Sequence, residues 1–351
     1  MPAETVLYFS NGTAIPGAQR VRALNLDKHR KFLVVAAIGD NSVHAISWLD
    51  RAPARAFDLM GMYYGSKASF ACESCDSLYL MQGTKWGQID MLSQSRDWEA
   101  LLKSYSAIMF ADDDLGMSTH VLNRAFEIFE EQGLQLAQPS VCRHPNSGSQ
   151  QAVVHQKEGL LLRHTAFVEI MAPIFSTDVL RGPLARALRG GHSGWGLDHI
   201  WPHLLGYPHK GIAVIDEVCM THPIQQPNKQ SVYARKRPDG LDPWGEYTML
   251  CAKYGVTETA WRQAGIPGPL GAHVWSEVPL PAAAEHPQRQ RAFPALAPLP
   301  TSAEGSEGLP VVDDPRLVRE AQLLGAYRAP YAVAHIRLVH ISELTPALAG
   351  A

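Results

Sequence analysis

The sequence AIMFADDDLGMSTHVLNRAFEIFEEQ, at residues 107–132, decides the fold class. Its first four residues, 107–110, form an apolar run typical of a strand buried on both faces. Three carboxylates follow at residues 112–114. Ser118 then starts a segment with apolar residues at helical spacing, and Gly133 is a natural helix stop. A strand, an acidic turn and a helix in this order indicate an α/β fold, in which ligands bind beyond the carboxyl ends of strands.

The rest of the chain repeats this alternation of strands and helices. We predict further strands over residues 31–38, 56–64, 89–92, 164–173 and 212–219. We predict helices over residues 42–50, 96–104 and 179–188 (the last starting near Pro183), and one that opens at Leu197. Ser42 is the expected cap of the first of these helices, since serine oxygens accept the unpaired N–H groups at a helix start.

Composition divides the chain into four parts. After an extension over residues 1–29, an α/β domain occupies 30–278. Residues 279–313 are rich in Pro, Ala and small polar side chains, which bury little apolar surface, so they are predicted to be a linker. Residues 314–351 form a C-terminal extension with a predicted helix near 314–327. With 351 residues and 46% hydrophobic content, the chain is long enough for a sizeable core.

Charge and cysteine content limit the partners and the compartment. A net charge of −3 gives no nucleic-acid footprint. Five scattered cysteines argue against a disulfide framework and for a reducing compartment. The pair at residues 72 and 75 is interpreted as structural, because zinc would need a second pair of ligands. We find no signal peptide and no apolar run of about 18 residues, so we expect a cytoplasmic protein, with peripheral membrane contact left open.

The acidic triplet is the strongest chemical feature. Three adjacent like charges raise one another's pKa values unless a cation is present. Mg²⁺ or Mn²⁺ suits oxygen ligands and completes its shell with water and substrate phosphates. The alternative is a solvated turn that caps the next helix, since carboxylates favour helix N-termini.

Two further segments carry candidate residues. In the glycine-rich GGHSGWGLD at residues 190–198, Trp195 offers a flat face for a sugar or base. Asp198 is a candidate general base toward an acceptor hydroxyl, or else only a helix cap. His222 follows the strand predicted at 212–219 and is a candidate metal ligand, although a lone histidine is more often structural.

Four segments in order, DDDL, FVEIMAPIFS, GWGLDHIWP and a strand ending in THP, resemble the uncharacterised family called domain of unknown function 707. The resemblance covers roughly residues 30–230. That family is similar to nucleotide-sugar glycosyltransferases of the A-type fold. The resemblance therefore implies a Rossmann-like mixed sheet flanked by helices.

The resemblance also implies roles for individual residues. Asp114 would bind the metal, with Asp112 at the metal or the donor ribose and Asp113 between them. His222 would be the C-terminal metal ligand, and Asp198 the acceptor-side base.

The resemblance also implies contacts with the substrates. Asp40 and Asn41, at the end of the first predicted strand, would lie near the nucleobase. Lys85 would approach the donor, and Trp195 and Glu169 would contact the acceptor or the sugar.

The predicted function is transfer of a sugar from a nucleotide-sugar donor to a hydroxyl acceptor, such as a glycan, with Mn²⁺ or Mg²⁺. Inversion and retention of configuration stay open. One alternative is a metal-dependent phosphohydrolase with an aspartate nucleophile in the triplet. The other is a non-catalytic carbohydrate-binding protein on a transferase scaffold, since a fold does not imply a function.

Overall fold

A computed structural model describes residues 5–49, 54–67, 70–143, 147–149, 151–223, 242–266 and 273–281. All of them belong to one unit, Met1–Pro300, and the second unit, Thr301–Ala351, lies outside the described residues. The predicted linker beyond residue 281 and the predicted C-terminal helix also lie outside them. The four predicted parts of the chain therefore stay predictions.

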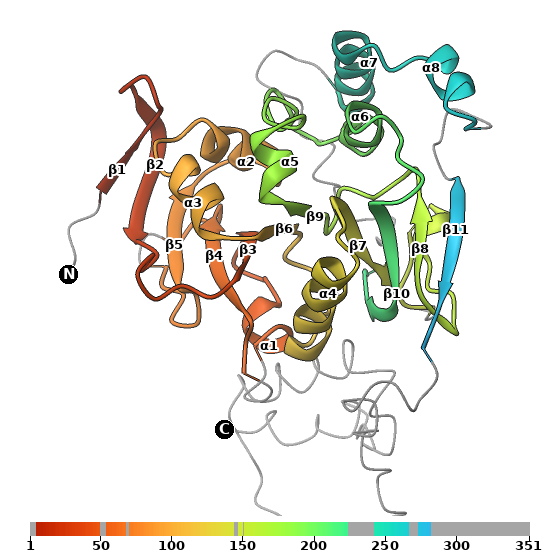
Figure 1. Cartoon of the computed structure of the whole chain (residues 1–351). Helices are drawn as coiled ribbons and strands as arrows, with labels where there is room; N and C mark the ends of the chain where they lie inside the picture. The colour runs from red at the N-terminus through yellow and green to blue at the C-terminus, as the bar shows by residue number, and fades with distance from the viewer. Residues whose placement is uncertain are drawn as a thin grey trace, which may run out of the picture. The chain divides into compact units, whose positions relative to one another are not determined.

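The described chain alternates strands and helices along most of its length (Figure 1). The strands are β1 (Thr5–Tyr8), β2 (Ala14–Arg22), β3 (Phe32–Ile38), β4 (Phe57–Tyr63), β5 (Ser77–Met81), β6 (Ala107–Ala111), β7 (Leu136–Val141), β8 (Leu160–Thr165), β9 (Ile174–Ser176), β10 (Ile212–Met220) and β11 (Val274–Pro279). The helices are α1 (His44–Ser47), α2 (Lys85–Ser93), α3 (Trp98–Ser104), α4 (Thr119–Glu131), α5 (Thr177–Arg181), α6 (Leu197–Leu204), α7 (Pro243–Tyr254) and α8 (Glu258–Gln263), with a 3₁₀ turn at Ala152–Val154.

The strands form one mixed sheet in the order β1-β2-β5-β4-β3-β6-β9-β7-β10-β8-β11. Strands β5, β4, β3 and β6 are parallel neighbours, and β7 pairs in parallel with β10. Strand β9 joins these two parallel groups through antiparallel pairing with both β6 and β7. The predicted mixed α/β sheet flanked by helices is confirmed.

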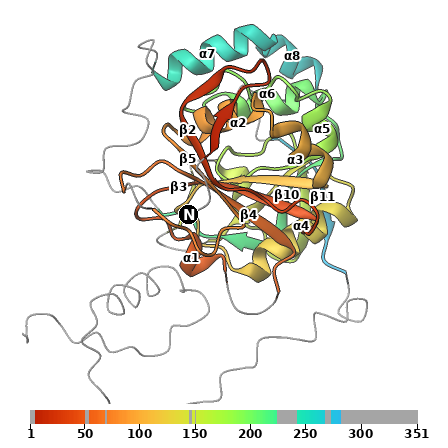
Figure 2. The ribbon, with the colours of Figure 1, turned by 90° about the vertical axis from the view of Figure 1, so that its left-hand side faces the viewer.

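Alternate residues of β3 enter two different cores, as the pleat of a strand buried on both faces requires. Leu33 and Val35 pack with α2, α3, α5 and α6, whereas Val34 and Ala36 pack with α4. Figure 2 shows these helices on opposite sides of the sheet, with α1 on the side of α4. The stacked rings of Phe32 and Phe126, 4.7 Å apart, fix α4 on the strand.

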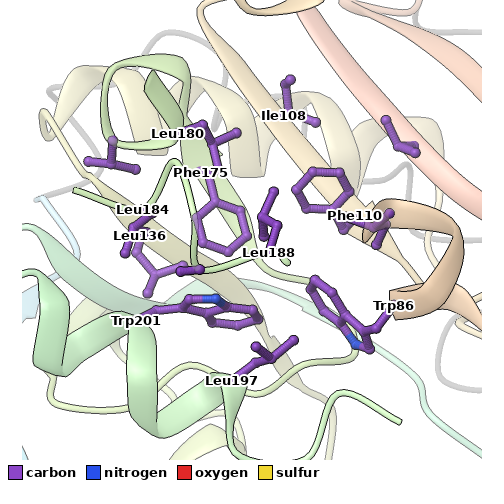
Figure 3. Close-up of a cluster of buried hydrophobic side chains, with 14 of the residues drawn as sticks. Trp86, Ile108, Phe110, Leu136, Phe175, Leu180, Leu184, Leu188, Leu197 and Trp201 are labelled. Atoms are coloured by element: carbon purple, nitrogen blue, oxygen red, sulfur yellow. The ribbon is translucent and has the colours of Figure 1, made fainter. Parts of the chain in front are cut away.

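Large aromatic side chains fill the core between the sheet and helices α2, α5 and α6 (Figure 3). Trp86 and Trp201 lie 5.2 Å apart, and Trp201 meets Phe175 edge-on at 4.9 Å. Fully burying one such ring is worth about 1.5–3 kcal/mol. This cluster joins the start of α2 to α6, and both helices carry predicted site residues.

Several predicted elements are wrong or shifted. Residues 89–92 belong to helix α2, not to a strand. So short a segment does not distinguish the periodicity of a helix from that of a strand, and the cap at Thr84 starts a helix that includes these residues. Of the strand predicted over residues 164–173, only residues 164–165 form a strand, because β8 ends at Thr165 and β9 starts only at Ile174. Helix α5 ends at Arg181, before Pro183. Ser42 does not cap α1, whose first residue follows Val43.

The expectation that disulfides are absent is also wrong. Cys72 is bonded to Cys75, and Cys142 to Cys219. The second pair is separated by 77 residues in sequence, yet β7 and β10 are adjacent parallel strands and bring the two sulfurs together. Among the described residues Cys251 is a free cysteine, and it is buried.

Candidate functional site

The order of strands places the acidic triplet at a switch point of the sheet. From β3 the chain passes to β4 and β5 on one side, and β6 lies on the other side of β3. Connections leave β3 and β6 in opposite directions there, and ligands of open α/β sheets bind at such a point, beyond the carboxyl ends. The turn at residues 39–42 follows β3, and the triplet at 112–114 follows β6.

Asp113 holds these two turns together. Its Oδ2 accepts hydrogen bonds from the backbone N–H of Gly39 (3.0 Å), from the hydroxyl of Ser42 (2.6 Å) and from the hydroxyl of Tyr64 (3.0 Å). Its own carbonyl accepts the N–H of Val43 at 2.9 Å. Burial raises the pKa of Asp113 in spite of these donors. The middle carboxylate therefore holds the two turns in place, and Ser42 and Tyr64 are partners that the sequence did not reveal.

Asp112 is engaged by Lys85, the first residue of α2. The Nζ of Lys85 lies 2.6 Å from Oδ1 of Asp112 and also donates to the carbonyls of Ile170 (2.6 Å) and Met171 (3.1 Å). An ammonium group has three N–H donors, and these three acceptors match them in number. The side chain of Lys85 is 8% exposed. This geometry favours Lys85 as the residue that positions Asp112, rather than one that reaches out to a ligand.

Asp114 is the exposed carboxylate of the triplet. Desolvation by the surrounding chain and the charge of Asp112 raise the pKa of Asp114 to about 6, although the residue is partly open to water. The charges of His222 and Lys85 act in the opposite direction. Asp114 is thus a carboxylate that a cation would stabilise.

His222 is brought to the triplet by backbone pairing. The N–H and carbonyl groups of Gly116 and Thr221 exchange two hydrogen bonds, of 2.8 and 2.9 Å. The Nδ1 of His222 lies 2.9 Å from the carbonyl of Gly148, which leaves Nε2 as the ring nitrogen available for a ligand. The Cys142–Cys219 disulfide ties the end of β10 to β7 just before this histidine.

Glu169 and Asp198 form a second acidic pair beside the triplet. Desolvation raises the pKa of Glu169 to about 7, and the charges of Asp198 and Asp112 contribute. Glu169 also accepts a hydrogen bond of 2.7 Å from the hydroxyl of Ser149. Desolvation likewise raises the pKa of Asp198 to about 7, against the effect of backbone N–H donors at the start of α6. Its Oδ1 is buried without a hydrogen-bond partner. A carboxylate with a pKa near neutrality is suited to accept a proton.

The loop that carries Trp195 is anchored by a residue that the sequence analysis missed. Glu246 of α7 is fully buried, and its carboxylate accepts the backbone N–H groups of His192 (2.8 Å), Ser193 (2.9 Å) and Gly194 (3.1 Å). Trp195 itself is 38% exposed. No local pattern marks Glu246, because its partners lie about 50 residues earlier in the chain.

The glycines of this loop serve packing as well as access. At Gly194 (φ +87°) an added Cβ would lie 2.1 Å from the ring of Trp86, so the loop can cross the indole only with glycine there. Gly196 (φ +94°) starts α6 and packs against Tyr247. Gly194 and Gly196 therefore allow this loop to pack closely against Trp86 and Tyr247.

Asp40 and Asn41 lie in the turn that follows the last residue of β3, and their contact with a nucleobase stays a prediction. The hydroxyl of Tyr63 donates to Oδ1 of Asp40 at 2.5 Å, and this bond lowers the pKa of Asp40. The Nζ of Lys67 lies 3.6 Å from the same carboxylate. Asn41 is exposed.

The donor set fits a hard cation that keeps few protein ligands. Asp112, Asp114 and His222 supply oxygen and imidazole donors at one end of the sheet. Within the described chain, however, three metal-ligating atoms approach one another to within 4.8 Å only at His44, Cys72 and Cys75. A cation held by Asp112, Asp114 and His222 would therefore have to draw further ligands from water or a bound phosphate.

The fold and the site define the chain as an α/β protein with a carboxylate-rich site at the switch point of a mixed sheet. Residues 98–244 match the family described as "Protein of unknown function (DUF707)". This match confirms the family resemblance predicted from the sequence, over the part of the chain that holds most of the site. No curated protein matches the chain.

Solved structures of TarS from S. aureus resemble the fold. TarS 1-349 in complex with UDP-GlcNAc is 11% identical, with a TM-score of 0.43 over 67% of this chain and 70% of that chain. The complex of TarS 1-349 with UDP is 12% identical, with a TM-score of 0.40 over 67% and 69%. At this level of similarity the likeness carries no argument about activity.

Proposed function

We propose that the chain is a metal-dependent glycosyltransferase that moves a sugar from a nucleotide-sugar donor to a hydroxyl acceptor. One observation carries the proposal. Besides desolvation, the charge of Asp112 raises the pKa values of both Asp114, an exposed carboxylate, and Glu169, and Glu169 is also influenced by the charge of Asp198, whose own pKa is about 7. A diphosphate and an acceptor hydroxyl need this pairing of cation site and proton acceptor.

The residues of the cation site would either bind the metal or position a residue that lies beside it. Asp114 and His222 would hold Mn²⁺ or Mg²⁺, and Lys85 keeps Asp112 in place next to them. When bound, the metal supplies positive charge that stabilises a departing nucleoside diphosphate. Lys85 is already paired with Asp112, so the metal would have to supply this positive charge.

The acceptor side rests on Asp198, Glu169 and Trp195. The carboxylate of Asp198, whose side chain is 17% exposed, would accept the proton of the acceptor hydroxyl. Glu169, with its pKa also near 7, would keep a proton on the pair at neutral pH and so limit their repulsion. Trp195 would offer its exposed face to a sugar ring.

Thermal unfolding with nucleoside diphosphates and nucleotide-sugars tests the donor side. Each ligand is added with Mn²⁺ or with EDTA, to the wild type and to Asp114→Ala. We expect one nucleotide class to stabilise the wild type in a metal-dependent way, by about 2.7 kcal/mol at a hundred times its Kd. The shift should vanish in Asp114→Ala and persist in Asp178→Ala, whose side chain is 89% exposed.

A transfer assay separates the proposal from its alternatives. Release of the nucleotide that depends on a hydroxyl acceptor supports the transferase. Release of phosphate without an acceptor would favour the phosphohydrolase. Sugar binding that survives both EDTA and Asp198→Asn, without turnover, would favour the binding protein.

The compartment also belongs to the proposal. None of the helices that the structure describes combines the length and apolar character that crossing a bilayer requires. The cytoplasmic location stays a prediction, and the two disulfides count against it because they persist in oxidising compartments.

A further inference from the structure

A second cluster of metal-ligating side chains lies apart from the acidic triplet. It consists of His44 on α1 and of Cys72 and Cys75 in the turn before β5. The three residues are 5%, 4% and 2% exposed, and their ligand atoms all lie within 4.8 Å of one another. The sequence analysis dismissed the cysteine pair because it lacked a nearby partner, and folding supplies one from 28 residues earlier.

The distance from the imidazole of His44 to the sulfur of Cys72 matches that between two ligands of a tetrahedral metal. The Nε2 of His44 lies 3.5 Å from the Sγ of Cys72. Zinc bonds of about 2.3 Å to sulfur and 2.0 Å to nitrogen, at a tetrahedral angle, place two ligands about 3.5 Å apart. The other ring nitrogen of His44, Nδ1, is buried without a hydrogen-bond partner. The ring of His44 also packs edge-on against Trp48, with the ring centroids 6.3 Å apart, and this contact leaves Nε2 facing Cys72.

The turn keeps its shape by bonds that do not involve sulfur. The guanidinium of Arg22 donates to the carbonyls of Cys72 (2.9 Å) and Cys75 (2.6 Å), and the N–H of Cys75 donates to the carbonyl of Cys72 at 3.4 Å. These contacts would hold both side chains toward His44 after the disulfide opens.

We propose that His44, Cys72 and Cys75 form a binding site for zinc, or another thiophilic divalent cation, in the reduced state of the pair. The disulfide in the structure is the oxidised state of the same site. This inference is independent of the proposed transferase function.

Reduction of the disulfide converts the oxidised state into the state that binds the cation. A dithiol, or two molecules of a thiol, gives two electrons and two protons to the Cys72–Cys75 bond and forms a disulfide. The two thiols then lose their protons to solvent as they bind the cation. The sulfurs move apart to about 3.8 Å, the separation across a tetrahedral zinc. His44 is the third ligand, and water occupies the fourth position.

Cobalt titration of the full chain tests the site. The protein is reduced with a phosphine, freed of metal with a chelator, and titrated with Co²⁺, whose bonds to thiolate give an intense charge-transfer absorption that oxygen ligands do not. We expect one equivalent with this absorption in the wild type, displaced by Zn²⁺. It should be lost in Cys75→Ser and retained in Asp114→Ala. His44→Ala should weaken Co²⁺ binding at least about tenfold, or about 1.4 kcal/mol.

A measurement on the wild type alone guards against variants that do not fold. Bound Zn²⁺ should slow the alkylation of Cys72 and Cys75 in the reduced protein, and peptide mass spectrometry separates them from Cys142 and Cys219. The proposal is wrong if reduced wild type shows no thiolate-to-cobalt absorption, if that absorption survives in folded Cys75→Ser, or if Zn²⁺ leaves the alkylation of this pair unchanged.

Discussion

Asp198→Asn should stabilise the protein above neutral pH while it removes the proposed base. The pKa of Asp198 rises from 3.8 to about 7 because the carboxyl group is desolvated, and its side chain is only 17% exposed. At 1.36 kcal/mol per pKa unit this difference is worth at most about 4 kcal/mol. Asparagine keeps the size of the side chain and carries no charge that burial would penalise.

The pH dependence follows from proton linkage. Between pH 3.8 and about 7 the folded state keeps the proton of Asp198 and the unfolded state has lost it. Because the folded state binds more protons, the wild type loses stability as pH rises through this window. The variant lacks this term, so its stability relative to the wild type should grow from pH 4 to pH 8 and level off there.

Thermal unfolding from pH 4 to pH 8 measures this difference. A gain of about 2 kcal/mol, half the upper bound, raises Tm by roughly 4–8 °C in a domain of this size. Asp178→Asn is the control, because it changes an exposed carboxylate and should stay within about 0.5 kcal/mol of the wild type. A variant that is less stable than the wild type at pH 8, or whose difference does not change with pH, would refute the assigned burial of Asp198.

Three further predictions concern the frame of the site. Glu246→Gln should cost about 2 kcal/mol in urea unfolding, because three backbone N–H groups lose a charged acceptor; a variant of wild-type stability would contradict this anchor. Gly194→Ala should destabilise by about 1–3 kcal/mol in the same assay, because its Cβ would overlap Trp86 at a positive φ, whereas a neutral effect would mean that the loop lies elsewhere. Cys142→Ser should lower stability by up to roughly 4 kcal/mol, since the bond to Cys219 closes a loop across 77 residues, and non-reducing mass spectrometry should find that bond in the wild type.

The fold class was predictable because its signals are local. The apolar runs that form β3, β4, β6 and β10 are long enough to be recognised as strands. The acidic triplet directly follows one of them, β6, whose residues are all buried. Strand β5 was not predicted, and residues 89–92 of α2 were predicted to be a strand, because a short apolar segment does not separate the two periodicities. The cap at Thr84, not the apolar pattern, decides α2.

The sequence singled out residues that the fold brings near one another, but it did not reveal their arrangement. Asp112, Asp114, Glu169, Asp198 and His222 do gather at one end of the sheet, as the electrostatic influences among them show. The sequence did not show which role each of these side chains has. That role depends on which hydrogen bonds the side chain makes, and those partners come from distant segments.

The sequence by itself determined the alternation of strands and helices and the chemical types present at the carboxyl end of β6, because periodicity and residue type are properties of neighbours along the chain. Only the tertiary structure decided that Asp113 holds two turns together, that Lys85 forms an ion pair with Asp112, and that His44 contacts the cysteine pair. The reason is physical: hydrogen bonds, ion pairs and sulfur contacts act over a few ångströms in space, and the folded sheet alone sets which residues come that close.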